Sequence, residues 1–182
     1  MTQLKIALAG IVLFAAACGP ATPPSPAPTT VLATTVPSAP LTKSAPVAAG
    51  GLLVAIKTEH HADHDRLILE FGGTTAPGHT IKYVSEVRED PSDRPVTLTG
   101  TAFLQIVLDG GTLDTSPRES DPNKVERYAG PRRLSPDLPL IKEVAVTGDF
   151  EAHLSFGVGL SRKADFKVQT LTAPARVVIQ FR

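Results

Sequence analysis

The sequence is poor in the residue types that build reactive centres and aromatic binding platforms. Among its 182 residues are no Trp, one Cys and two Tyr, and aromatic residues make up 5%. A single cysteine excludes a disulfide within the chain. The 18 Lys and Arg residues balance 18 Asp and Glu residues, so charge alone would not recruit nucleic acid or anionic lipid. With so few aromatics, sugar binding is not demanded by composition.

The chain also lacks an apolar run long enough to cross a bilayer. Its N-terminal run, residues 6–17, is uncharged over 12 residues and follows Lys5. Twelve residues reach about 18 Å as a helix, which is too short for a membrane span. The positive flank, the apolar run and the small residues 15–17 are typical of an export signal. We therefore predict that residues 1–17 are a signal peptide.

Cys18 follows this signal directly. Residues 15–19 (AAACG) resemble the bacterial lipoprotein box, in which the cysteine is lipidated and becomes the mature N-terminus. The resemblance implies anchoring to the outer face of the cell membrane through lipidated Cys18. Loss of Lys5 leaves 17 basic and 18 acidic residues, a net charge of −1, so attachment must come from the lipid. The alternative is ordinary secretion with a free Cys18.

Residues 18–50 have the composition of a tether. Residues 19–50 hold eight of the 17 prolines and one charged residue, Lys43. Such a segment buries too little apolar surface to offset its ordering entropy. We predict a disordered linker that reaches on the order of 100 Å if it adopts polyproline II.

Residues 51–182 suffice for one domain with one core. Apolar residues alternate with polar ones at the period of strands, and no helical period is present. We predict an all-β fold, an antiparallel β-sandwich or open barrel of about eight strands. The run 102–109 is apolar on both faces and should lie centrally, whereas residues 110–139 lack a periodic element and form a loop that is either functional or mobile. The expected strands are 52–57, 66–71, 81–87, 102–109, one around 144–146, 151–160, 166–171 and 175–181.

Two of these strands match position by position. Residues 66–71 (RLILEF) and 176–181 (RVVIQF) share Arg, three aliphatic residues, Glu or Gln, and Phe. Alternation places the residues at 67, 69, 71, 177, 179 and 181 inward and the others outward. We interpret the pair as equivalent strands from two halves of a pseudo-symmetric sandwich.

Residues 175–181 (ARVVIQF) resemble the closing strand of the AMIN domain, a β-sandwich module of bacterial cell-wall amidases and secretins. The AMIN-like domain of actinobacterial lipoproteins is more similar still. Its matching pieces are 64–71 (HDRLILEF), 83–84, the turn 90–92 (DPS), 95–98 (PVTL), 102–104 (AFL), 143–144, 148–151 (GDFE) and 156–160 (FGVGL).

This resemblance implies an envelope protein and, for the broader family, non-catalytic binding to peptidoglycan. The partners would be the membrane, through the lipid, and peptidoglycan or another envelope protein. Candidate ligand contacts are the outward polar residues Arg66, Glu70, Arg176 and Gln180. Arginine can grip a carboxylate bidentately, and Gln or Glu can meet sugar hydroxyls. The alternative is cross-strand pairing that stabilises the sheet. AMIN domains commonly carry Asp at the position of Gln180.

A second candidate is metal or small-molecule capture by the histidines of residues 60–65 (HHADHD). His60, His61 and His64 have the ligand chemistry for zinc or copper. The alternative is a solvated turn in which His64 pairs locally.

Catalysis has little support in the sequence, and we expect neither enzyme activity nor a cofactor. The chain has no G-x-S-x-G elbow and no H-E-x-x-H motif. His153 and Ser155 share a strand face, but positions two apart project in parallel about 6.8 Å apart. On the same face, Gly157 and Gly159 leave a bare strip that would admit a ligand backbone or partner strand, or relieve bending of the sheet.

Overall fold

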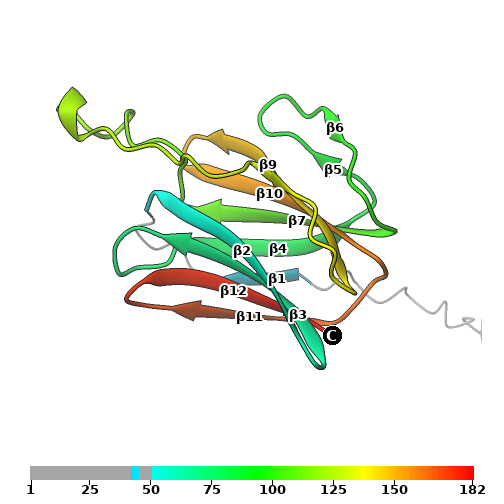
Figure 1. Cartoon of the computed structure of the whole chain (residues 1–182). Coiled ribbons are helices and arrows are strands. Elements are labelled where there is room, and N and C mark those ends of the chain that lie inside the picture. The colour runs from blue at the N-terminus through cyan, green and yellow to red at the C-terminus, as the bar shows by residue number, and fades with distance from the viewer. Residues whose placement is uncertain (1–41, 46–50) are drawn as a thin grey trace, which may run out of the picture. The chain divides into compact units, whose positions relative to one another are not determined.

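The computed structural model describes residues 42–45 and 51–182 of the chain. Its regular elements are strands, with one short 3₁₀ turn, and the described residues contain no α-helix. The strands form two layers (Figure 1). The six-stranded sheet has the order β1(Thr42–Ala45), β4(Gly78–Val84), β7(Ala102–Asp109), β10(His153–Leu160), β9(Ile141–Phe150), β8(Arg133–Leu134). The four-stranded sheet has the order β11(Phe166–Leu171), β12(Ala175–Phe181), β3(His64–Phe71), β2(Leu53–His61).

One continuous core fills the space between the two sheets. Alternate residues of each strand point inward, and their side chains are nearly all excluded from solvent. The three largest are Phe71 and Phe181 from the four-stranded sheet and Phe156 from the six-stranded sheet. The ladders that join neighbouring strands in both sheets are antiparallel. The predicted all-β antiparallel sandwich is thus confirmed.

Several strand boundaries follow the sequence pattern directly. The expected strands 102–109, 166–171 and 175–181 coincide with β7, β11 and β12. Strand β7 also lies inside its sheet, between β4 and β10, as its two apolar faces predict.

Other boundaries differ from the prediction. The first strand runs to His61 instead of ending at residue 57, and β4 begins three residues earlier than expected. The turn expected at residues 147–149 lies at Glu151 and Ala152, which have φ angles of 48° and 67°. Two left-handed residues suit a tight hairpin, but non-glycine residues there give no turn signal in a sequence.

Part of the predicted tether forms a strand. Residues 42–45 pair as β1 with the edge of β4, so the expectation of a disordered linker throughout 18–50 is wrong for these four residues. The signal peptide, Cys18 and the rest of the linker lie outside the described residues.

A two-stranded arm, which we define as residues 85–99, folds over the outer face of the six-stranded sheet. It contains β5(Val87–Arg88) and β6(Pro95–Val96). Val87 and Leu98 of the arm form a small second core with Ala145 of β9. A Cβ atom at Gly157 would meet Val87 at 2.6 Å. The glycine strip of β10 is therefore filled by the chain itself, and β10 is buried on both faces.

The segment between β7 and β9 projects from the sandwich (Figure 1). It contains η1(Pro122–Lys124) and β8, and an isolated bridge pairs Asp114 with Arg127. The carboxylate of Asp149 accepts a hydrogen bond from the Leu113 amide at 2.8 Å and so fixes the base of the projecting segment. The scarcity of regular structure in residues 110–139 agrees with the sequence prediction.

Candidate ligand-binding face

The two matching segments are direct neighbours in the four-stranded sheet. Strands β3 and β12 pair antiparallel, with Ile68 opposite Val178 at the centre. Arg66 is opposite Gln180 at one end, and Glu70 is opposite Arg176 at the other. The two strands are thus related by a local two-fold axis through Ile68 and Val178. The two strands are neighbours in one sheet, and not equivalent strands from two halves of a pseudo-symmetric sandwich as predicted.

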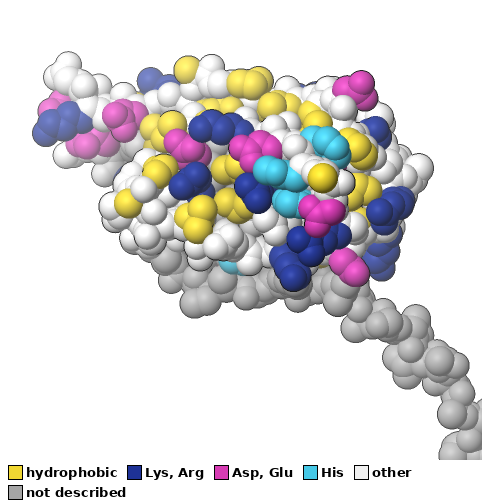
Figure 2. All heavy atoms as spheres, turned by 60° about the horizontal axis from the view of Figure 1, so that its bottom comes forward, with side chains coloured by type: hydrophobic (Ala, Val, Ile, Leu, Met, Phe, Trp, Pro, Cys, Tyr) yellow, Lys and Arg dark blue, Asp and Glu magenta, His cyan; other side chains and the backbone are white. Residues whose placement is uncertain are grey.

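The four predicted contact residues therefore share one surface, the outer face of the four-stranded sheet. Directly paired residues have Cβ atoms about 5 Å apart and point to the same side. Figure 2 shows this side of the molecule, where basic and acidic side chains alternate among apolar ones. We call the outward residues of β3 and β12, with their neighbours on β2 and β11, the open face.

The charged partners of β3 come from β2 and not from β12. Arg66 donates to Glu59 at 3.3 Å, and Lys57 donates to Glu70 at 3.0 Å. Arg176 and Gln180 have no side-chain hydrogen bond or ion pair to any described residue. Cross-strand pairing therefore accounts for two of the four residues and leaves the two on β12 available.

The arginines are also held close to the sheet. The Nε atoms of Arg66 and Arg176 are both buried without a hydrogen-bond partner. Ile68 and Val178 between them are only 6% and 5% exposed, although they point outward. Buried donors normally have acceptors. The centre of the open face is thus apolar, flanked by guanidinium groups whose bonding capacity is incompletely used.

Asp65 locks one end of this face to the opposite sheet. It is 1% exposed, and its Oδ2 accepts from the amides of Leu140 at 2.6 Å and Ile141 at 2.9 Å. His60 bonds its Oδ1 at 2.8 Å. Burial raises the pKa of Asp65, but these hydrogen bonds outweigh it and hold the pKa below its ordinary value.

The three histidines considered for metal binding do not converge. His60 lies on the inward side with Asp65, whereas His61 and His64 pair across the hairpin on the outer side. The latter two stack at 4.6 Å between ring centroids, and each contacts a carboxylate, Glu59 or Asp63. Within residues 51–182, no three His, Cys, Asp or Glu side chains are grouped so as to hold a metal ion.

His153 and Ser155 do lie on one face of β10, as predicted. His153 pairs with Asp109 at 2.9 Å, and Ser155 is buried beneath a hollow beside the arm.

Sequence reasoning missed the contribution of β2 to the open face. Lys57 and Glu59 supply the charges that pair with β3. The sequence carries no periodic signal for this part of β2, because residues 57–61 (KTEHH) are all polar and do not alternate with apolar ones.

A known protein family matches most of this chain. The model of the AMIN-like domain family matches residues 51–182. The chain belongs to the AMIN-like domain family. Domains of this family are typical of cell-envelope proteins, which indicates an extracytoplasmic location for this AMIN-like chain. Searches of curated proteins and of solved structures each found no match.

Of the residues that the structure describes, none forms a helix with the length and hydropathy needed to cross a membrane.

Proposed function

We propose that this protein is a lipid-anchored, non-catalytic envelope protein whose AMIN-like domain binds peptidoglycan through the open face. The observation that carries the proposal is the pair of unpartnered side chains on β12, Arg176 and Gln180, beside the partnered Arg66 and Glu70. Family membership supports the choice of the cell wall as the ligand.

The open face fits a polymer of sugars and short peptides. Its outline is that of a sheet and not of a closed pocket, so an extended chain can lie along it. The guanidinium of Arg176 can donate two parallel hydrogen bonds to a stem-peptide carboxylate. The amide of Gln180 can donate to and accept from sugar hydroxyls. Between these polar ends lie Ile68 and Val178, which are almost fully covered by neighbouring side chains, so the polar groups carry the recognition.

Sedimentation with purified sacculi tests this role. The full chain in detergent should pellet with sacculi, and Arg176→Ala should weaken binding by about tenfold, since charge-assisted hydrogen bonds are the strong ones at such sites. Arg66→Ala should weaken it less, because part of that guanidinium is committed to Glu59. Lys124→Ala, on the projecting segment, is the matched control and should bind normally.

Equal binding by wild type and Arg176→Ala, with unchanged thermal unfolding, would show that peptidoglycan does not bind through the open face. Failure of the wild type to pellet would reject peptidoglycan as the ligand.

The anchor is tested separately. A producing bacterium fed an alkyne-bearing fatty acid should label the wild type, and Cys18→Ala should abolish the label and release the protein from membranes. A labelled Cys18→Ala protein would contradict anchoring at this residue.

A further inference from the structure

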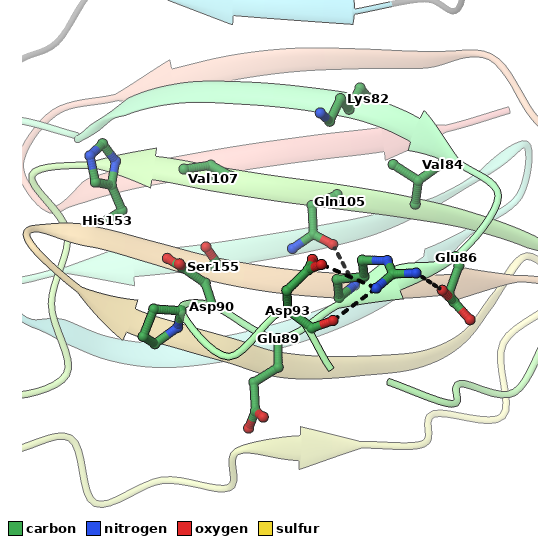
Figure 3. A pocket seen from close by; sticks show the side chains of 12 residues that line it. Lys82, Val84, Glu86, Glu89, Asp90, Asp93, Gln105, Val107, His153 and Ser155 are labelled. Carbon is green, nitrogen blue, oxygen red and sulfur yellow. Dashed lines mark hydrogen bonds and ion pairs between the residues drawn. The ribbon is translucent and has the colours of Figure 1, made fainter. Parts of the chain in front are cut away.

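A hollow of about 550 Å³ lies beside the arm, on the outer face of the six-stranded sheet. Strands β4, β7 and β10 form its floor, and residues 86–93 form its wall (Figure 3). Its volume is within the range that holds small ligands. The hollow and the open face belong to different sheets, so a ligand-binding role for the hollow would be independent of the proposed function.

Most charged side chains around the hollow are already paired with one another. These ion pairs, at 2.7 to 3.3 Å, join Arg88 to Glu86 and Asp93, Glu89 to Arg94, and His153 to Asp109. Their charges are consequently not free to recognise a ligand.

Three polar side chains that line the hollow are different. Within the described part of the chain, the side chains of Lys82, Asp90 and Ser155 have no hydrogen bond or ion pair. In Figure 3 all three lie around the hollow, and no dashed line reaches any of them. Ser155 is only 1% exposed. Its hydroxyl is a hydrogen-bonding group at the floor of the hollow that no other described residue engages.

Asp90 and Ser155 lie at the same end of the hollow. Gly148 is the cross-strand partner of Ser155, and a Cβ atom on Gly148 would come within 2.7 Å of the Asp90 Cβ. The missing side chain therefore lets Asp90 pack against β9 beside Ser155. One end of the hollow thus has a carboxylate and a hydroxyl.

Lys82 lies across the floor from this end. It is on β4 and Ser155 is on β10, with β7 between them. Neighbouring strands lie about 4.8 Å apart, so the two main chains are separated by about 10 Å or more. Val107 of β7 lies between them, with Thr80 and Ser155 as its cross-strand partners.

We propose that the hollow binds a free short peptide of two or three residues. Its ammonium group would contact Asp90 and Ser155, its carboxylate would contact Lys82, and its main chain would cross Val107. One unpaired charge of each sign favours a zwitterion over a simple anion or cation. Since an extended residue spans about 3.5 Å, two or three residues match the separation of the charges.

Isothermal titration of the full chain in detergent with four peptides, the all-L and all-D forms of dialanine and trialanine, tests the site. We expect saturable binding of at least one peptide, weakened about tenfold by Lys82→Met and by Asp90→Asn. Lys124→Met and Asp137→Asn alter exposed residues outside the hollow and should bind like wild type.

End-blocked peptides assign the two ends. N-acetylation of the peptide should weaken its binding to wild type but should weaken binding to Asp90→Asn little further. C-terminal amidation should likewise weaken binding to wild type but weaken binding to Lys82→Met little further. Absence of saturable binding by all four peptides, or equal losses in the two control variants, would overturn the proposal. Because sacculus pelleting uses a different face, it reads out the proposed function independently.

Discussion

The outer faces of the two sheets differ in what covers them. The six-stranded sheet presents Gly157, Gly159 and Ala145 outward, and the arm packs on these small residues through Val87 and Leu98. The four-stranded sheet instead alternates charged and aliphatic side chains, and no described segment of the chain packs over it as the arm does. Small residues on one face thus allow the chain's own arm to pack there, whereas long polar residues cover the other, which we propose as the binding face.

The two faces also differ in how they use carboxylates. Glu143 on the covered face is 4% exposed, accepts from the Thr99 amide at 2.6 Å and pairs with Arg133. Glu70 on the open face pairs with Lys57 but remains partly exposed. Glu143 thus anchors the arm on the covered face. Glu70 belongs to a solvated ion-pair network that contributes little to the free energy of unfolding.

The largest effect should come from filling the glycine strip. A Cβ atom at Gly159 would overlap the carbonyl oxygen of Thr99, so Gly159→Ala must displace the arm's backbone. We expect a loss of about 2 to 3 kcal/mol in unfolding free energy, measured by urea denaturation. Gly72→Ala is the control, because its Cβ would meet only ordinary contacts at 3.8 Å and beyond. Similar losses in both variants would mean that close contact with the arm is not the cause.

A smaller effect is expected from Glu143→Gln. The substitution keeps the shape but removes the charge that meets Thr99 and Arg133. We expect a loss of about 1.5 kcal/mol at neutral pH, because hydrogen bonds to buried charged groups are worth roughly this much. Faster amide exchange confined to residues 85–99 would accompany it if the arm loosens locally. A stability equal to wild type would show that the arm is held by its apolar contacts alone.

The same carboxylate predicts a pH dependence. Burial raises the pKa of Glu143, but bonds from Thr99 and Arg133 outweigh it and leave the pKa below its ordinary 4.5. Its stabilisation is therefore present above about pH 4.5 and lost as pH falls through the lower, folded-state value. The stability difference between wild type and Glu143→Gln should accordingly shrink below pH 4.5, as followed by thermal unfolding. A difference that stays constant down to pH 3 would contradict this linkage.

The smallest effect should come from the open face itself. Glu70→Ala breaks an ion pair whose lysine side chain is 53% exposed, and exposed pairs contribute less than about 1 kcal/mol. We expect a shift within that limit in urea denaturation. A larger loss would mean that the open face is a structural network and would weaken the case that it is kept for a ligand.

Much of the fold could be predicted because strands are marked by local alternation. The alternation in β3 and β12 predicted that Arg66, Glu70, Arg176 and Gln180 point outward, but the matching segments did not predict that the two strands pair directly. By contrast, the hairpin turn at Glu151 and Ala152 was missed because left-handed non-glycine residues leave no signature in a sequence.

The covered face could not be read from the sequence for a different reason. Gly157 and Gly159 indicate that something approaches closely, but not what does so. The approach depends on where the arm folds, and this is set by long-range contacts such as that of Glu143 with Thr99, 44 residues away. The unpartnered group formed by Lys82, Asp90 and Ser155 depends on the same placement, so no local motif announces it.

The most direct measurement places a photo-cross-linking amino acid at an exposed position on each face. Gln169 of β11 lies opposite Val178 on the open face, and Thr97 lies on the arm. After irradiation on sacculi and digestion of the wall, glycan-peptide adducts should form at Gln169 and be at least several-fold rarer at Thr97. Adducts formed mainly at Thr97, or absent from Gln169 in a chain that still pellets, would contradict recognition by the uncovered sheet.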